Sequence, residues 1–388
     1  MTPTRDDADA AFMHRALILA ERGRGRTTPN PMVGALIVSP DGIVVGRGFH
    51  ERAGTPHAEI HAIADAGDRA RGATLYCTLE PCCHTGRTGP CSVAVHQAGI
   101  ARVVAATTDP NPQVAGGGIR YLRDHGVDVT VGVLGDRAAR LNDVFFTNVT
   151  ERRPFVTLKI AMSLDGRIAA APGARTALTS AAANRHAQRL RAEVDAIAVG
   201  SETVLIDDPL LTARDVYRWR PLARVIFDNR LRTPPTARIF STLGDGPVII
   251  VTTKTAVQAR SCGLTSRLRA LEDAGATIVT TDTARDLTSA MTRLFADHGI
   301  GSLLLEGGAA LHAAAWNAGV VDRVRTYITP HALGPAGVPW EMPASFDWTM
   351  LHDTRSEWLG EDCLLEGYLH PLRQSLELRE SPEWREVS

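Results

Sequence analysis

The fold is decided by the stretch Thr78-Leu-Glu-Pro-Cys-Cys-His-Thr-Gly-Arg-Thr-Gly-Pro-Cys91, read together with Pro56-His-Ala-Glu59 upstream. His57, Cys82 and Cys91 offer one imidazole and two thiolates, the ligand chemistry that suits zinc. Three protein ligands leave a fourth coordination position for water, and Glu59 is close enough in sequence to move a proton of that water. The stretch therefore predicts a catalytic centre with one zinc ion per chain.

Length and charge narrow the class of protein. A chain of 388 residues is too long for one ordinary hydrophobic core and predicts two domains, with three as the alternative. The formal net charge of −1 gives no general attraction for nucleic acid or an anionic membrane, so we expect a small-molecule partner. With no signal-peptide pattern and no membrane-spanning run, a cytoplasmic location is expected. Four of the six cysteines crowd between positions 77 and 91, which favours metal binding over a disulfide framework.

Hydrophobic patterning predicts alternating strands and helices in the first half. Pro40-Asp-Gly42 separates two apolar runs and indicates a hairpin. Strands are expected at 32–39, 43–49, 73–79, 102–107 and 127–133, and helices at 8–22, 58–66, 92–98, 117–125 and 136–148. This α/β alternation predicts a largely parallel sheet with helices on both faces. Glu151-Arg-Arg-Pro154 is the expected boundary, giving domains at 1–152 and 153–372 and a charged, fraying tail at 373–388.

A second alternation begins at Phe155. Strands are expected at 155–161, 196–199, 224–227, 248–251, 277–279, 302–305 and 324–328, and helices at 180–192 and 309–318. Glu306-Gly-Gly308 joins one of these strands to a helix, and such a turn at a helix N-terminus can hold a phosphate or another anion. No G-x-G-x-x-G follows the first strand of this half, so a Rossmann dinucleotide site is not predicted.

The cysteine-rich stretch has two competing interpretations. A structural zinc site needs a fourth protein ligand, for which the sequence offers Cys77, Cys83, His61 and His84. A zinc protease is excluded, because the glutamate between His57 and His61 stands at the third position of the pentad and not the second.

Other candidate residues have plain structural alternatives. Asn30 lies between two prolines and fits a turn, His50 fits a strand end, and Arg87 fits a solvated loop. In the second half, Asp207 stands near a proline and fits an Asx turn, while Arg214 fits an ordinary surface position. The residues by themselves leave these alternatives open.

Four motifs of the first half occur together: Thr-Pro-Asn-Pro-x-Val-Gly at 28–34, Gly-x-His at 48–50, His-Ala-Glu at 57–59 and Glu-Pro-Cys-x-His-x-Gly-Arg-Thr-x-Pro-Cys at 80–91. They resemble the deaminase domain of the bifunctional riboflavin-biosynthesis deaminase-reductases. The cysteines are nine positions apart, whereas the general signature of zinc nucleobase deaminases has them three apart. The resemblance implies a cytidine-deaminase-like fold with His57, Cys82 and Cys91 on zinc, Glu59 as the catalytic residue, and Asn30, His50 and Arg87 on the substrate.

The second half carries Thr157-Leu-Lys159, Ser163-Leu-Asp-Gly166, Arg189-Leu-Arg191, a Gly200–Arg214 run with Asp-Asp-Pro, and Glu306-Gly-Gly308. These motifs resemble the reductase domain of the same family, whose fold is dihydrofolate-reductase-like and binds NADPH without a Rossmann motif. The implied catalytic residues are Lys159 and Asp207. The implied substrate contacts are Arg175, Arg191, Leu211, Arg214 and Glu306, and the implied cofactor contacts are Ala161, Ala177, Thr203, Asp207, Gly307 and Gly308. Two converging arginines suit a ribose-phosphate substrate.

One segment departs from the family pattern. The family has Ser-x-Trp-Ile-Thr where this chain has Arg175-Thr-Ala-Leu-Thr179. Ala177 takes the place of a tryptophan that packs on the cofactor, and a large aromatic ring buries about 150–250 Å². Weaker cofactor binding is therefore expected, although Arg175 offers a new charge to a phosphate.

Together the halves predict a bifunctional enzyme. Its first domain would deaminate 2,5-diamino-6-ribosylamino-4(3H)-pyrimidinone 5′-phosphate, and its second would reduce the ribosyl group with NADPH to give 5-amino-6-ribitylamino-uracil 5′-phosphate. The resemblance also implies a homo-oligomer. The alternatives are a deaminase with an impaired or repurposed reductase domain, and a binding protein with structural zinc.

Overall fold

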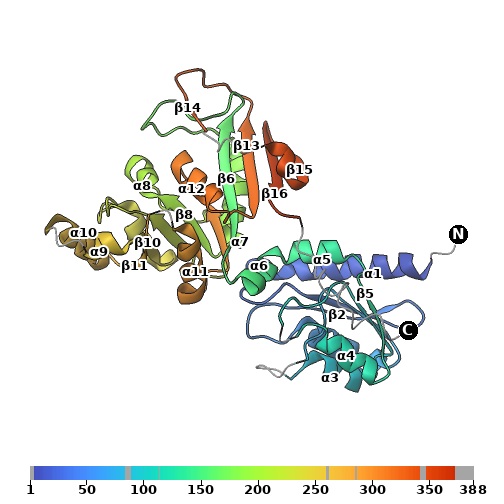
Figure 1. Cartoon of the computed structure of the whole chain (residues 1–388). Coiled ribbons are helices and arrows are strands. Elements are labelled where there is room, and N and C mark those ends of the chain that lie inside the picture. The colour runs from blue at the N-terminus through green and yellow to red at the C-terminus, as the bar shows by residue number, and fades with distance from the viewer. Residues whose placement is uncertain are drawn as a thin grey trace. The chain divides into compact units, whose positions relative to one another are not determined.

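The computed structural model describes residues 4–83, 89–112, 114–258, 262–284, 286–340 and 347–371. The chain divides into two compact units, one up to Glu151 and one from Arg152 to Pro371 (Figure 1). Arg87, His84 and the predicted tail at 373–388 lie outside the described residues. Among the described helices, none has the length and apolar character needed to cross a membrane.

The first unit is built on a five-stranded sheet with the order β2-β1-β3-β4-β5. Strand β1 runs antiparallel to β2 and β3, and β3, β4 and β5 are parallel to one another. The predicted hairpin is confirmed, with the Gly42 amide donating to the Ser39 carbonyl at its turn. The strands are β1 (Gly34–Val38), β2 (Val44–Phe49), β3 (Thr74–Cys77), β4 (Arg102–Ala105) and β5 (Asp128–Val131).

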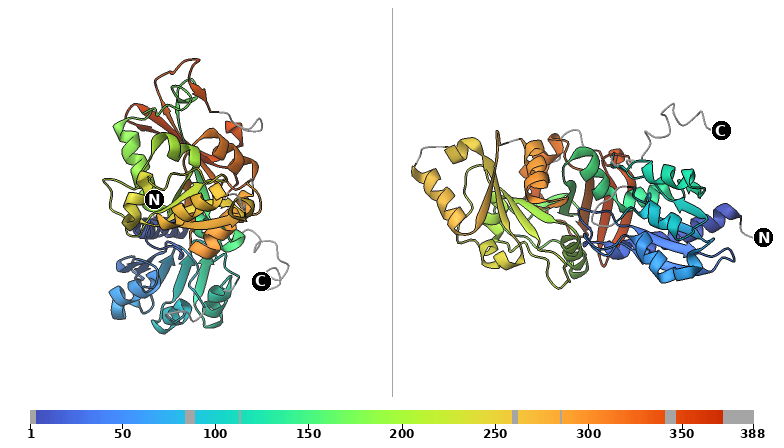
Figure 2. Two further views of the ribbon diagram at one scale, coloured as in Figure 1. Left: turned by 90° about the vertical axis from the view of Figure 1, so that its left-hand side faces the viewer. Right: turned by 90° about the horizontal axis from the view of Figure 1, so that it is seen from below.

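Helices cover both faces of this sheet, as Figure 2 also shows. Successive residues of β1 point to opposite faces, so Leu36 packs with α1 and α5 while Ile37 packs with α2, α3 and α4. Every residue of β1 is buried, as expected for a strand covered on both sides. The helices are α1 (Arg5–Ala20), α2 (Ala58–Ala66), α3 (Cys91–Gln97), α4 (Gly117–Asp124), α5 (Gly135–Leu141) and α6 (Asp143–Glu151).

Two glycines of β2 let α2 lie directly on the hairpin. A Cβ added at Gly48 would stand 2.1 Å from the Ala58 carbonyl oxygen, and one at Gly46 would stand 2.3 Å from the Ala62 carbonyl oxygen. Only glycine permits this approach. The first turn of α2 is thereby fixed against the end of β2, which matters because α2 begins next to His57.

The second unit contains a nine-stranded sheet with the order β11-β10-β9-β8-β12-β6-β13-β16-β15, and a small sheet of β14 and β7. Seven strands from β11 to β13 are parallel, and β16 and β15 form an antiparallel edge hairpin. The strands are β6 (Phe155–Ser163), β7 (Arg167–Ala169), β8 (Ala196–Gly200), β9 (Ala223–Phe227), β10 (Val248–Thr253), β11 (Ala276–Thr281), β12 (Ser302–Leu305), β13 (Arg323–Thr329), β14 (Val338–Pro339), β15 (His352–Leu359) and β16 (Asp362–Tyr368).

Helices also cover both faces of the larger sheet. One core joins β6, β8 and β12 to α11 and α12, while the opposite face packs against α7, α8 and α10. The helices are α7 (Ala181–Glu193), α8 (Ser201–Asp207), α9 (Lys254–Gln258), α10 (Cys262–Asp273), α11 (Leu287–His298) and α12 (Ala309–Asn317). The α10 and α11 helices and the β15–β16 hairpin were not predicted from the sequence.

Candidate active sites

The three predicted metal ligands meet at one point of the first unit. His57 Nδ1 lies 3.2 Å from Cys91 Sγ and 3.6 Å from Cys82 Sγ, and the ligand atoms all lie within 4.8 Å of one another. Zinc bonds of about 2.3 Å to sulfur and about 2.0 Å to nitrogen give ligand separations of about 3.5–3.8 Å in a tetrahedral site. The donor set and its spacing therefore fit a zinc ion.

Each ligand sits where a secondary-structure element begins or ends. His57 is the N-cap of α2, Cys91 is the first residue of α3, and Cys82 follows β3, with the Cys91 amide donating to its sulfur at 3.3 Å. Hydrogen bonds from Cys91 and His57 lower the pKa of the Cys82 thiol to about 4, so a thiolate is favoured. Helix N-termini also favour negative charge.

The other cysteines and His61 are not part of this group among the described residues. Cys77 is fully buried in the sheet, where its sulfur lies 3.7 Å from the Val104 carbonyl oxygen. Cys83 turns away toward the carbonyl of Val114, at 3.8 Å. In the part of the chain that the structure describes, the metal group has three protein ligands, as a catalytic site requires.

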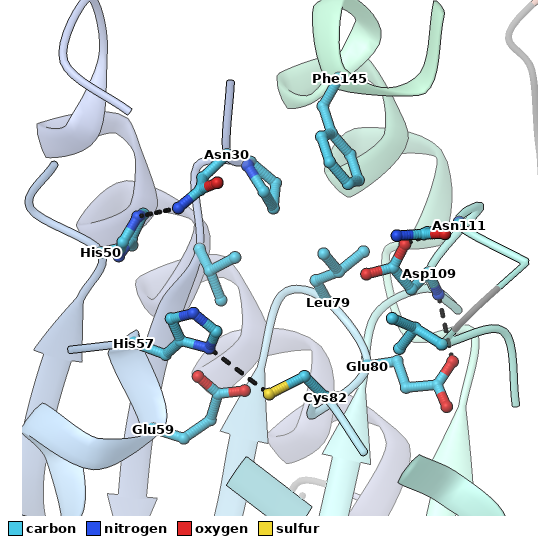
Figure 3. Close-up of a pocket in the computed structure, with 13 residues that line it drawn as sticks. Asn30, His50, His57, Glu59, Leu79, Glu80, Cys82, Asp109, Asn111 and Phe145 are labelled. Carbon is cyan, nitrogen blue, oxygen red and sulfur yellow. Dashed lines mark hydrogen bonds between the residues drawn. The ribbon is translucent and has the colours of Figure 1, made fainter. Parts of the chain in front are cut away.

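Glu59 lies beside these ligands in the first turn of α2 (Figure 3). The side chain is 3 % exposed, and its Oε2 has no hydrogen-bond partner among the described residues. Burial raises the pKa of Glu59 to about 7. A buried carboxylate oxygen without a partner is costly, so its natural partner is a ligand or water at the metal position.

A cavity of about 190 Å³ opens over the ligands. Asn30 and His50 form one polar wall of it, and Leu79 and Phe145 add apolar surface (Figure 3). His50 Nδ1 lies 3.2 Å from the Pro56 carbonyl, which can only accept, so Nδ1 carries the proton and Nε2 accepts from Asn30 at 3.1 Å. Burial lowers the pKa of His50, consistent with a neutral ring.

Asp109 and Asn111 form a second polar wall that the sequence analysis missed. Asp109 Oδ1 accepts from the Asn111 amide at 2.8 Å, and burial raises the pKa of Asp109 to about 7. A signal was present: Pro110-Asn-Pro112 repeats the Pro29-Asn-Pro31 pattern and directly follows a predicted strand. Both Pro-Asn-Pro turns thus face the same cavity.

In the second unit, the candidate residues gather at the carboxyl ends of the central strands. β8 continues through α8 to β9 on one side, whereas β12 continues through α12 to β13 on the other. Ligands of open α/β sheets bind where the connections diverge in this way, here between β8 and β12. Thr203 on α8 and Gly307 after β12 meet there, since a Cβ added at Gly307 would lie 3.3 Å from Thr203 Oγ1.

Arg191 and Glu306 also meet at this edge. The guanidinium donates from Nε and Nη2 to the two carboxylate oxygens at 3.0 and 2.8 Å, and from Nη1 to the Thr212 carbonyl at 3.1 Å. Although burial opposes it, the charges of Arg191 and Lys159 lower the pKa of Glu306 to about 2. Lys159 Nζ lies 5.4 Å from the centre of the Tyr327 ring.

The remaining candidates are spread around the same edge. Asp207 ends α8, and burial raises its pKa while the charge of Arg175 opposes that shift. Leu211 is buried with φ of 52°, whereas Arg175, Ala177 and Arg214 are exposed. Ala161 lies on β6 opposite Tyr327, and Gly308 is the N-cap of α12.

His312 is a member of this cluster that the sequence analysis did not single out. It lies one turn into α12, is 4 % exposed, and neither ring nitrogen has a hydrogen-bond partner among the described residues. Its position four residues after Gly308 was the available signal, since this is the first turn after the Gly-Gly motif.

Comparison with known proteins agrees with this division. Residues 6–107 match the family model "cytidine and deoxycytidylate deaminase zinc-binding region", and residues 154–365 match "RibD C-terminal domain". The chain is 41% identical to the riboflavin biosynthesis protein RibD of Escherichia coli K12 over 84% of this chain and 89% of that protein. It is 39% identical to the Synechocystis RibD over 93% of this chain and 96% of that protein.

Solved structures give the same result. The structure of Acinetobacter baumannii RibD matches with a TM-score of 0.81 and 35% identity, covering 94% of this chain and 99% of that one. A Thermotoga maritima diaminohydroxyphosphoribosylaminopyrimidine deaminase/5-amino-6-(5-phosphoribosylamino)uracil reductase matches with a TM-score of 0.80 and 32% identity, at the same coverage.

Fold and sites together define a two-domain enzyme, a cytidine-deaminase-like hydrolase followed by a reductase. The chain belongs to the RibD family of bifunctional riboflavin-biosynthesis enzymes. The predicted fold class, a cytidine-deaminase-like domain followed by a dihydrofolate-reductase-like one, is thereby confirmed.

Proposed function

We propose that the first unit hydrolyses the amine from 2,5-diamino-6-ribosylamino-4(3H)-pyrimidinone 5′-phosphate at the cavity above His57, Cys82 and Cys91. The observation that carries this proposal is the buried Glu59 Oε2, which lies beside the three ligand atoms and has no hydrogen-bond partner among the described residues. The structurally similar Thermotoga maritima protein is a diaminohydroxyphosphoribosylaminopyrimidine deaminase, which supports this choice of substrate.

His57, Cys82 and Cys91 would hold one zinc ion per chain. When bound, zinc supplies a water molecule acidic enough to be deprotonated near neutral pH. Glu59 takes that proton and returns it to the leaving amine, a transfer that needs an oxygen free of other hydrogen bonds. Asn30 and Asp109 hold opposite polar edges of the pyrimidine, and Phe145 covers its ring.

Glu59→Gln tests this assignment, because glutamine keeps the shape of the side chain but cannot carry the proton. We expect ammonia release to fall by at least about 10²-fold. Zinc content, measured by elemental analysis, should stay at one ion per chain. A variant that keeps both zinc and full turnover would show that Glu59 has no chemical role, as the structural-zinc alternative requires.

In the second unit we propose NADPH-dependent reduction of the ribosyl group to ribityl. The residues that would hold the cofactor are Thr203, Asp207, Gly307 and Gly308, at the carboxyl ends of β8 and β12, together with Ala161 and Ala177; the cofactor would supply the hydride. Lys159 and the Arg191–Glu306 pair hold the sugar, and Leu211 packs against the substrate. Arg214 and Arg175 are exposed and would contact the phosphate.

This half is tested by supplying the deaminated intermediate directly and following NADPH oxidation. A steady rate supports the bifunctional reaction, while a background rate from a chain that still releases ammonia would favour an impaired or repurposed reductase. Replacing Arg175 by serine, the small hydroxyl residue of the family pattern, shows whether this departure changes the Michaelis constant for substrate.

Two further expectations belong to this proposal. The likeness to the family supports association of the chain with copies of itself, which light scattering can measure. A biosynthetic role on phosphorylated intermediates with NADPH supports work in the cytoplasm.

A further inference from the structure

Glu80 makes an unusual set of contacts for a residue so close to the metal ligands. Its carboxylate is 3 % exposed and accepts four backbone N–H bonds. Oε2 accepts from Asp109 and Gly116 at 3.2 and 2.9 Å, and Oε1 accepts from Gly118 and Ile119 at 2.9 and 3.2 Å. One side chain therefore saturates its acceptor sites on a single segment of the backbone.

The segment that Glu80 binds is the second polar wall of the cavity. Asp109, Asn111 and Val114 line the cavity; one donor is the amide of Asp109 itself, and the other three follow Val114. Figure 3 shows Glu80 below Asp109 and Asn111, with the bond between Glu80 and the Asp109 amide drawn. The Glu80 amide in turn donates to the Thr107 carbonyl at 3.0 Å, at the end of the preceding strand.

The fit of this segment against Glu80 is tight. Gly116, the N-cap of α4, adopts a φ of 73° in the left-handed region that favours glycine, and its N–H donates to the Glu80 carboxylate. A Cβ added at Gly118 would lie 1.8 Å from the Pro81 carbonyl oxygen. The beginning of α4 therefore packs in direct contact with the residues that precede Cys82.

We propose that Glu80 is a positioning residue of the deaminase site. It fixes Asp109 and Asn111, together with the start of α4 at 116–119, relative to the loop that carries Cys82. The role depends on the number and geometry of the four hydrogen bonds. Glu80 also lines the cavity, but its carboxylate oxygens are engaged by these four bonds, and it is not one of the three residues of the metal group. This inference rests on the proposed deamination at the cavity.

Glu80→Gln is the direct test, because an amide offers one acceptor oxygen and directs its NH₂ group at two N–H donors. We expect the Michaelis constant for the pyrimidine substrate to rise at least tenfold, with a smaller change in kcat and one zinc ion still bound. Hydrogen exchange at the amides of Gly116, Gly118 and Ile119 should accelerate in the same variant. Glu80→Asp, which keeps both oxygens on a shorter side chain, should recover part of both effects.

Two results with the Glu80 variant would overturn the proposal. One is an unchanged Michaelis constant despite faster exchange, because the wall would then not matter for binding. The other is zinc loss in proportion to activity, because Glu80 would then serve the metal loop. If Glu80→Gln does not fold, Gly116→Ala loosens the same contact, since alanine resists a φ of 73°. The Michaelis constant, the hydrogen exchange and the zinc content of that variant then test the proposal in the same way.

Asp9→Asn is the matched control. Asp9 is also a buried carboxylate of the first unit, bound to Arg102 and Tyr76, but it lies on α1 and does not line the cavity. It should lower stability and leave the Michaelis constant unchanged; a similar rise would mean that general loosening explains the Glu80 effect and would overturn the proposal. Ammonia release by the unaltered chain tests the proposed function separately.

Discussion

Arg191 and Glu306 hold each other in a two-point ion pair, although 115 residues separate them in the chain. Their side chains are only 14 and 12 % exposed. The sequence analysis expected both residues to contact the substrate and did not pair them with each other. In the folded chain they form a fixed pair of no net charge, whereas Arg214 is exposed. The pair is therefore suited to orient hydroxyl groups, which need donors and acceptors in defined places.

Breaking this pair should damage the second unit selectively. Glu306→Gln leaves the Arg191 guanidinium buried without its counter-charge, which costs about 3–5 kcal/mol. We expect a lower free energy of unfolding of the second unit by calorimetry and a loss of NADPH oxidation. Ammonia release should persist. Glu202→Gln is the control: it breaks the exposed pair with Arg232, whose removal costs about 0–1 kcal/mol. Equal effects of the two variants would contradict the importance of burial.

The stability of the second unit should fall as the pH is lowered from about 6.5 to about 4. Burial, with the nearby charge of Lys159, lowers the pKa of His312 from 6.5 to about 4. As the pH falls, the unfolded chain binds this proton before the folded chain does, so the free energy of unfolding decreases between pH 6.5 and pH 4. Below pH 4 both states are protonated at His312, and this residue lowers the stability no further. A difference of about 2.5 pKa units corresponds to about 3 kcal/mol.

Calorimetry of the intact chain between pH 4 and pH 7 measures this effect. His312→Gln has no proton to bind and should flatten the dependence of the second unit. An unchanged pH slope in that variant would assign the dependence to other groups. Glu306, whose pKa is about 2, should contribute only below pH 4.5, where its stabilisation is lost as the carboxylate is protonated.

Removing the metal should separate the two activities. All three ligand atoms lie in the first unit, and the candidate reductase residues lie in the second. Dialysis against a chelator should abolish ammonia release and leave NADPH oxidation with supplied intermediate unchanged. Added zinc should restore the first activity. Loss of both on chelation would show that the metal also supports the second unit.

Gly48→Ala should displace the metal ligands without touching them. The new Cβ would stand 2.1 Å from the Ala58 carbonyl, so the start of α2 must move away from β2. We expect zinc content below one ion per chain and a loss of stability of about 1–3 kcal/mol. Gly244→Ala is the control, because a Cβ there meets nothing within 4 Å. Full zinc content in Gly48→Ala would show that the hairpin does not set the ligand positions.

Most residues of the deaminase site could be predicted from the sequence, because they stand in short motifs at the ends of strands and the starts of helices. The strand before Cys82 and the helix after His57 were both predicted, so their meeting at one edge followed from the sheet. The pairing of Arg191 with Glu306 could not be predicted from the sequence motifs, because it depends on how α7 packs over the ends of strands that are distant in the sequence. β15 was missed because its first seven residues are exposed and show no apolar alternation. In contrast, α11 has Leu287, Ala290, Met291 and Leu294 at helical spacing, a pattern that the sequence analysis did not use.

The separation of the two sites into two units has a genetic consequence. Every described residue of the proposed deaminase site precedes Glu151, and every described residue of the proposed reductase site follows Arg152. A chain disabled at Glu59 and another disabled at Glu306 should therefore complement each other when mixed or expressed together. The intermediate then passes between molecules through solvent, so two alleles that each fail alone can together sustain the pathway.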